Sequence, residues 1–253
     1  MSRSFRTEGI VLRNYRFGEI HKGVTFLSPE YGIQNAIAYG AYSAKGKLRS
    51  ITNPLCTGTF FLYRDPVKDS IKISDLDCRE FFEGIRSSIV KFFTASVWLE
   101  TVLKTYGGEA KEVFALLSGS LRILSSAGEE ASSWLLVQFL WRYLQLSGAA
   151  PDTNTCSACG CSSVDAAGLV YRRGSGSFFC QTCAGSRSGE QPLELSVKAL
   201  SYLRYSQGIP LEKSLSICPD ETSVSSLKKV FLYLVSDLAG GQLNSIRTGT
   251  GVL

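Results

Sequence analysis

The stretch CSACGCSSVDAAGLVYRRGSGSFFCQTC (residues 156–183) decides how the second half of this 253-residue chain folds, because it holds five of the eight cysteines. A Cys-x-x-Cys pair lies at each end of it, with twenty residues between the pairs. This spacing is typical of a zinc site with four thiolate ligands. Four protein ligands complete a tetrahedral shell and leave no position for substrate or water. We therefore expect a structural zinc bound by Cys156, Cys159, Cys180 and Cys183.

The residues between the two pairs predict a β-hairpin, with strands at 169–171 and 177–179. A metal-free remnant and a thioredoxin-like dithiol are the alternatives, but the dithiol motif belongs beside a βαβ pattern that this sequence lacks. Cys161 is interpreted as a spare thiol, and whether it replaces a ligand stays open. The three cysteines outside this stretch are expected to be packing residues: Cys56, Cys78 and Cys218.

The first third of the chain has the pattern of a small β-barrel. Five short segments are rich in β-branched and aromatic residues and are separated by turn signals. They cover residues 9–15, 22–28, 33–42, 57–65 and 70–76. Five strands in so short a region favour a five-stranded barrel of the oligonucleotide-binding (OB) type. An SH3-like barrel is the competing interpretation.

After Asp77 the apolar residues recur three and four positions apart, which predicts helices. The helical segments cover residues 78–108, 109–126, 129–148, 196–203 and 224–238. Residues 134–144 are apolar nearly all round, as in a helix buried inside a bundle. The expected fold is therefore α+β and multidomain: an OB-fold domain at 1–78, a helical domain at 79–150 and 191–253, and a zinc ribbon inserted at 151–190.

Charge is distributed unevenly along the chain. Residues 1–74 carry eleven Lys or Arg against five Asp or Glu, a net of +6, whereas residues 75–253 have a net of −1. Such asymmetry indicates that the predicted barrel binds a polyanion. We expect no transmembrane helix, because no long uncharged apolar run occurs, and no secretory signal. The expected compartment is the cytoplasm.

The sequence lacks the motifs of common enzymes. His21 is the one histidine, and no nucleophile elbow or zinc-protease motif is present. The segment GAYSAKGKL (residues 40–48) is not a phosphate-binding Walker loop, because its glycines are one residue too far apart and Leu48 replaces the required Ser or Thr. We therefore expect a binding protein without catalysis and without a small-molecule substrate.

Four segments resemble the N-terminal domain of the bacterial RecO family of recombination mediators: TEGIVLRNYRFGE (7–19), VTFLSPEYG (24–32), AYGAYSAKGKLRS (38–50) and LYRD (62–65). The order of barrel, helical domain and four-cysteine insertion is also similar to that family from end to end. One departure is the run Ser43-Ala44-Lys45-Gly46-Lys47, where the family often carries Ser-Lys or Ser-Arg.

The resemblance implies a DNA-repair protein without turnover, cytoplasmic and nucleoid-associated. It implies binding of single- and double-stranded DNA, annealing of complementary strands, and contacts with the single-stranded DNA-binding protein and with RecR. With these partners such proteins help to load the RecA recombinase.

Single-strand binding by an OB-fold combines a basic groove with aromatic stacking platforms. The predicted DNA-binding residues are cations and one aromatic residue of the barrel segments: Arg13, Arg16, Tyr42, Lys45, Lys47, Arg49 and Arg64. Phe26, Phe60 and Phe61 are expected to fill the barrel instead.

The resemblance also implies that the helical domain receives the acidic C-terminal tail of the single-stranded DNA-binding protein. Such a tail requires an apolar pocket with a cation at its rim for the terminal carboxylate. Arg142 is the first candidate, since it interrupts an apolar helix, and Lys104 and Arg122 are the others. The alternative is that Arg142 is an ordinary surface residue with a buried stem.

Two other classes of protein remain open. A zinc-ribbon RNA-binding or transcription-associated protein would use Arg172 and Arg173 of the ribbon as its nucleic-acid surface. A zinc-stabilised scaffold would bind protein through the barrel.

Overall fold

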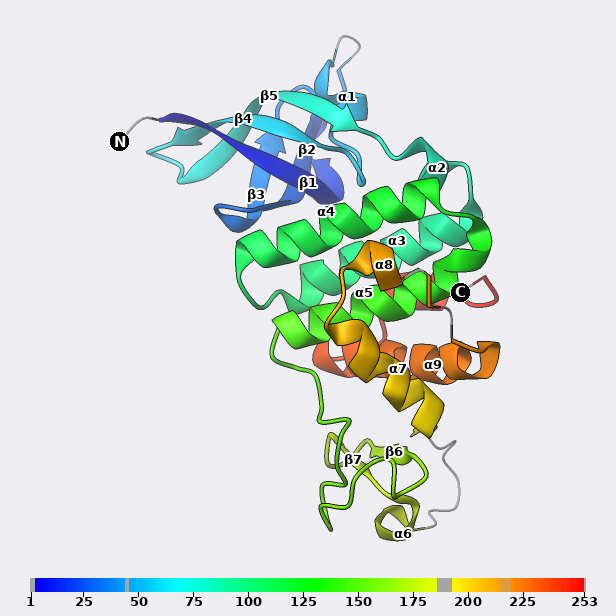
Figure 1. The fold of residues 1–253 in the computed structure, drawn as a ribbon. Helices are drawn as coiled ribbons and strands as arrows, with labels where there is room; N and C mark the ends of the chain where they lie inside the picture. The colour runs from blue at the N-terminus through cyan, green and yellow to red at the C-terminus, as the bar shows by residue number, and fades with distance from the viewer. Residues whose placement is uncertain (1–2, 44–45, 186–192, 215, 218, 253) are drawn as a thin grey trace. The chain divides into compact units, whose positions relative to one another are not determined.

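We analysed a computed structural model of the chain, which describes residues 3–43, 46–185, 193–214, 216–217 and 219–252. The described residues form two compact units, which divide between Ser126 and Ala127. Among the described residues, none of the helices is both long enough and apolar enough to cross a membrane. The two units are described separately below (Figure 1).

The first unit begins with a closed five-stranded barrel in the order β1-β2-β3-β5-β4, with β4 paired back to β1. Its strands are β1 (Ser4–Phe17), β2 (His21–Ser28), β3 (Gly32–Ala38), β4 (Thr57–Asp65) and β5 (Ser70–Glu80). All neighbouring strands are antiparallel except β3 and β5, which pair in parallel. The predicted OB-type barrel is confirmed (Figure 1).

The barrel core consists of alternate residues of the five strands. Phe26 and Phe60 stack at its centre, with ring centres 4.2 Å apart, and both are fully buried. Gly9 leaves room for this pair, because a Cβ there would lie 2.7 Å from the Phe60 ring. The expectation that Phe26 and Phe60 fill the barrel is confirmed. The same expectation for Phe61 is wrong, since its side chain points out of the barrel and is 40% exposed.

The third strand is shorter than its sequence pattern predicted. It ends at Ala38, because the chain turns at residues 39–42 and Gly40 adopts a positive φ of 66°. The short helix α1 (Leu48–Ile51) then leads to β4. Arg49 is therefore on a helical turn.

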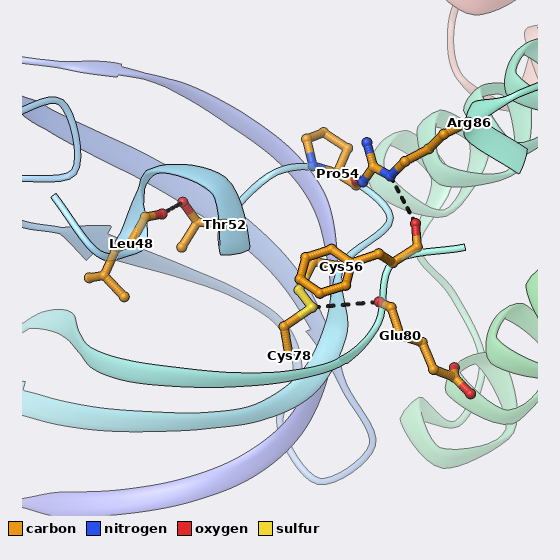
Figure 2. The surroundings of a disulfide bond; sticks show 8 residues. Leu48, Thr52, Pro54, Cys56, Cys78, Glu80 and Arg86 are labelled. Atoms are coloured by element: carbon orange, nitrogen blue, oxygen red, sulfur yellow. Dashed lines mark hydrogen bonds between the residues drawn. A yellow bond between two sulfur atoms is a disulfide. The ribbon is translucent and has the colours of Figure 1, made fainter. Parts of the chain in front are cut away.

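Cys56 and Cys78 pack in the barrel core as expected, but they also form a disulfide bond with each other, which the sequence pattern did not predict (Figure 2). The β4–β5 register explains the pairing: Gly58 lies opposite Cys78, and a register shift after Thr57 brings the residues before β4 beside the end of β5. Their Cα atoms lie 6.2 Å apart. The other cysteine expected to pack, Cys218, lies outside the described residues.

Three helices complete the first unit: α2 (Glu83–Arg86), α3 (Ile89–Thr105) and α4 (Ala110–Ser126). Ser88 caps the N-terminus of α3, since its hydroxyl accepts a hydrogen bond from the Lys91 N–H at 3.3 Å. Helix α4 packs against α2, α3 and β2. Arg86 ties α2 to the barrel by donating to the Pro54 carbonyl at 2.7 Å (Figure 2).

The second unit contains helices and the cysteine module. Its helices are the 3-10 turn η1 (Glu129–Ala131), α5 (Ser132–Leu146), α6 (Gln181–Ala184), α7 (Val197–Gln207), α8 (Leu211–Ser214), α9 (Glu221–Leu238) and α10 (Asn244–Thr248). Helix α5 is buried along nearly its whole circumference, as its sequence predicted. It packs on α9, where Trp141 and Phe231 stack with ring centres 5.4 Å apart.

The cysteine module contains a three-stranded sheet in the order β7-β6-β8. Its strands are β6 (Leu169–Arg172), β7 (Ser177–Phe179) and β8 (Leu193–Leu195). The first two form the predicted hairpin, and β8 packs against α9. The predicted fold class is thus confirmed: an OB-type barrel, C-terminal helices and an inserted four-cysteine ribbon. The domain boundaries at 78, 150 and 190 stay predictions.

Candidate nucleic-acid interface and metal centre

A continuous row of side chains crosses the outer face of all five barrel strands. The strand registers place Tyr15 beside Gly23, Gly23 beside Ile37, Ile37 beside Lys72, and Lys72 beside Tyr63. Their neighbours along the strands, such as Val24, point into the core, so the row points outward. We call these five residues the aromatic row: Tyr15, Gly23, Ile37, Lys72 and Tyr63.

Tyr15 lies flat on β2 at one end of the aromatic row. The absence of a side chain at Gly23 permits this, because a Cβ there would lie 2.2 Å from the Tyr15 ring. The ring is 41% exposed, and the Arg13 guanidinium lies 5.6 Å from its centre. An exposed ring with a cation beside it is the kind of platform on which a nucleic-acid base stacks.

Lys72 is the cation at the other end of the aromatic row. Its Nζ lies 5.6 Å from the centre of the Tyr63 ring and 5.7 Å from that of Tyr39. It also forms an ion pair with Asp65 at 3.0 Å. Hydrogen bonds from Lys72 and from the Val67 and Lys68 N–H groups lower the pKa of Asp65 to about 2. The hydrogen bond with Asp65 raises the pKa of Lys72, so both groups stay charged at neutral pH.

A groove of about 430 Å³ lies between β1, β3 and the β4–β5 turn. Its lining includes Tyr15, Phe17 and the predicted DNA contact Arg64, together with Asn35 and Asp69. Arg64 and Asp69 form an exposed ion pair at 3.7 Å. The groove therefore places aromatic rings next to polar groups that can donate and accept hydrogen bonds.

The remaining predicted DNA-binding residues lie near the turns at one end of the barrel. Arg16 donates to the Glu19 carbonyl at 2.9 Å. Tyr42 is exposed, and its N–H donates to the Ile20 carbonyl at 2.9 Å. Lys47 and Arg49 are exposed at the start of α1. Lys45 lies outside the described residues.

Sequence reasoning missed two cations of the barrel: Lys72 on its outer face, and Lys22, whose side chain points inward. Both could have been placed from strand alternation. Lys72 alternates with the apolar Ile71 and Ile73, which predicts an outward side chain, and Lys22 shares the inward parity of Val24. Gly23 was missed as well, because its role depends on Tyr15 of another strand.

The four predicted zinc ligands come together in the second unit. The Sγ atoms of Cys156, Cys159, Cys180 and Cys183 all lie within 4.8 Å of one another, and those of Cys159 and Cys180 are 3.8 Å apart. A tetrahedral zinc with Zn–S bonds of about 2.3 Å requires sulfurs about 3.8 Å apart. Cys161 lies beside this set, with its Sγ 3.3 Å from that of Cys159. The donor set fits a metal ion, and zinc is the ion that four thiolates favour.

Backbone N–H groups favour the thiolate form in this cluster. Burial raises the pKa of Cys156, but hydrogen bonds from Cys159, Cys180 and Ala158 outweigh burial and lower that pKa to about 6. The Cys183 N–H donates to the Cys180 sulfur at 3.4 Å and is the main cause of the lowered pKa of Cys180. The backbone thus favours thiolates at Cys156 and Cys180, whereas the hydrogen bond with the neighbouring Cys180 sulfur raises the pKa of Cys183 to about 12.

The three predicted rim cations lie in different surroundings. Lys104 forms an ion pair with Glu100 at 2.9 Å on α3. Arg122 pairs with Glu80 at 2.9 Å and borders a hollow of about 380 Å³ that Phe82 also lines. Arg142 donates to the carbonyls of Ser206 and Ile209 at 2.9 and 2.7 Å, so its guanidinium caps the C-terminal end of α7.

Comparison with known proteins agrees with this architecture. The family described as "Recombination protein O N terminal" matches residues 1–81, and "Recombination protein O C terminal" matches residues 86–247. The chain belongs to the RecO family. As a RecO-family member it is a DNA repair protein.

Its curated relatives carry the name "DNA repair protein RecO". The protein of Syntrophus aciditrophicus is 23% identical over 244 residues, which cover 96% of this chain and 93% of the relative. That of Bacillus pumilus is 31% identical over 193 residues, covering 74% and 72%. The similarity thus extends over barrel, helices and ribbon.

Proposed function

We propose that this RecO-family chain is a non-enzymatic recombination mediator whose barrel binds single- and double-stranded DNA. The aromatic row carries the proposal, because it combines stacking surfaces with a cation on the face that crosses β2 and β3. Those two strands form the ligand face of OB-folds in general. The net charge of +6 on residues 1–74 provides the sequence-independent attraction to phosphate.

Annealing of complementary strands follows from the same surface. A basic face that holds two strands at once lowers their mutual repulsion, so base pairing becomes the favoured outcome. The family also suggests that the protein acts with RecR and helps to load RecA on strands covered by the single-stranded DNA-binding protein.

A structural zinc in the ribbon belongs to this proposal. Its four thiolates would hold the ion and, through it, tie β7 and α6 to the start of the module. A closed set of four ligands supplies folding energy and no catalysis.

The acidic tail of the single-stranded DNA-binding protein is proposed to bind the helical region. Arg122 is tested first as the rim cation, because Arg142 caps α7 whereas Arg122 borders a hollow. Glu80 and Glu83 line the same hollow, so an acidic tail would have to displace Glu80 from Arg122. A tail peptide that bound the Arg122→Ala variant as tightly as the wild type would remove Arg122 from this role.

The ribbon is a weaker nucleic-acid surface than the barrel. Arg173 is exposed, and its guanidinium lies 4.9 Å from the centre of the Tyr233 ring on α9. The barrel is favoured over the ribbon because the excess positive charge of the chain, a net of +6, lies in residues 1–74. The protein-binding scaffold alternative is tested by the same DNA-binding measurements, because a scaffold of that kind would not bind oligothymidylate.

Stacking on the aromatic row is tested with Tyr15→Ala and oligothymidylate. The variant should lose affinity on the order of tenfold, because one stacked base contributes about 1–3 kcal/mol. An abasic strand of equal length should bind wild type and variant alike, since it offers phosphates without bases. Tyr205→Ala is the matched control, because Tyr205 is 62% exposed in the second unit. Equal affinities of wild type and Tyr15→Ala for oligothymidylate would contradict the proposal.

A further inference from the structure

Lys22 is a lysine buried inside the barrel. Its side chain is on the same side of β2 as Val24 and Phe26, and the residue is only 1% exposed. A charged side chain is rarely buried to this extent unless its ammonium is satisfied by hydrogen bonds. The position excludes direct contact with a DNA phosphate, so the ammonium must serve another purpose.

The ammonium of Lys22 holds the segment around α1. It donates to the Arg49 carbonyl at 2.6 Å and to the Asn53 Oδ1 at 3.1 Å. From β1, the Asn14 side-chain amide donates to the same Asn53 Oδ1 at 3.1 Å and to the Thr52 carbonyl at 3.2 Å. Residues 49–53 are therefore attached to two barrel strands through one buried polar network.

The same ammonium also contacts Tyr42, its ring centre lying 5.4 Å from the Lys22 Nζ. Tyr42 comes from the turn after β3, and Arg49 from α1. Both have exposed side chains and are predicted DNA contacts. Burial lowers the pKa of Lys22, and the nearby Arg49 charge adds to this effect.

We propose that Lys22 is a positioning residue that fixes Tyr42 and Arg49 in the geometry that binds a DNA strand. The inference rests on the proposed DNA-binding function of the barrel. The network holds the backbone of Arg49 and so fixes the point from which the Arg49 side chain extends. The Lys22 ammonium contacts the Tyr42 ring and so fixes the position of that ring. Lys22 thus acts on DNA through two exposed neighbours without touching it.

A double-mutant cycle on the full chain tests the proposal, with Lys22→Met as the variant. Methionine has a similar length but cannot donate hydrogen bonds. Lys22→Met alone should weaken binding of oligothymidylate on the order of tenfold, because each charge-assisted hydrogen bond to the segment is lost. In a Tyr42→Ala, Arg49→Ala background, Lys22→Met should weaken the affinity for oligothymidylate by no more than about twofold, since the side chains that Lys22 positions are absent.

Arg64→Ala provides the control background, because Arg64 lies outside the network on β4. There the loss caused by Lys22→Met should again be about tenfold. Should Lys22→Met not fold, Asn53→Ala replaces it, since this removes the acceptor shared by Lys22 and Asn14 and predicts the same pattern.

Three results would overturn the inference while leaving the proposed function intact. The first is an equal loss in both backgrounds, which marks a general effect on folding. The second is an unchanged affinity of Lys22→Met. The third is an unchanged affinity of the Tyr42→Ala, Arg49→Ala variant, which leaves nothing to position. A wild-type chain that does not bind oligothymidylate would instead overturn the proposed function.

Discussion

At the scale of single residues, ionised carboxylates hold local structure together in both units. Asp220 is the N-cap of α9, where it accepts hydrogen bonds from the Ser223 N–H at 2.9 Å and from the Ser223 and Thr222 hydroxyls. These hydrogen bonds, chiefly the one from the Thr222 hydroxyl and then the one from the Ser223 N–H, lower the pKa of Asp220 to about 2. The pKa of Asp65 is also lowered to about 2, chiefly by the hydrogen bond from Lys72.

The lowered pKa of Asp220 predicts a pH-dependent stability. A carboxyl group with a lower pKa in the folded state stabilises the protein above its ordinary pKa, and this contribution is lost as the pH falls toward about 2. Asp220→Asn can still cap the helix but does not titrate. The thermal unfolding midpoint of the wild type should therefore fall more steeply than that of Asp220→Asn between about pH 4 and pH 2. Parallel curves would contradict this role.

Residue roles that lie within one strand could be predicted, and those that depend on another strand could not. Phe26 and Phe60 fill the barrel as expected, and strand alternation alone would have excluded Phe61, the neighbour of Phe60. The contact of Tyr15 with Gly23 and the disulfide between Cys56 and Cys78 depend on strand register. Register is set by the whole sheet, so a single sequence does not provide it.

At the scale of elements, the ribbon is the part of the chain that the sequence predicted most completely. The two Cys-x-x-Cys pairs and the hairpin between them all appear in the structure, because thiolate spacing and short strands are local features. The short helix α1 was missed, since four residues carry no periodic signal. Strand β8 was missed as well.

Zinc content should depend on the four clustered cysteines and not on Cys161. The purified wild type should contain about one zinc per chain. Cys180→Ser should lose it, because Cys180 is buried within the cluster and also caps α6. Cys161→Ser is the matched control and should keep it. Metal analysis of the three proteins decides the point. A zinc-free wild type from zinc-replete cells, or loss of zinc in Cys161→Ser, would contradict the assignment.

At the scale of the whole molecule, the uneven charge of the sequence coincides with the barrel. The region with a net of +6 is residues 1–74, which form the barrel and α1, apart from the end of β5. The order of barrel, helices and inserted ribbon was also predictable, because strand and helix periods differ. The division into compact units after Ser126 was not, since helix packing and not helix periodicity decides it.

The central claim is that the barrel binds DNA, with basic residues around α1 in contact with phosphate. The salt dependence of single-stranded DNA binding tests this claim most directly. The logarithm of the affinity falls with the logarithm of salt concentration, with a slope that loses about 0.7 per phosphate contact removed. A variant with Lys45→Ala, Lys47→Ala and Arg49→Ala should therefore bind all sequences more weakly, with a slope shallower by about 2. Its control replaces three exposed lysines outside the barrel, Lys111, Lys213 and Lys229, and removes the same charge. The control variant should keep the wild-type slope. An unchanged slope in the barrel variant, or an equal change of slope in both variants, would contradict DNA binding by the barrel.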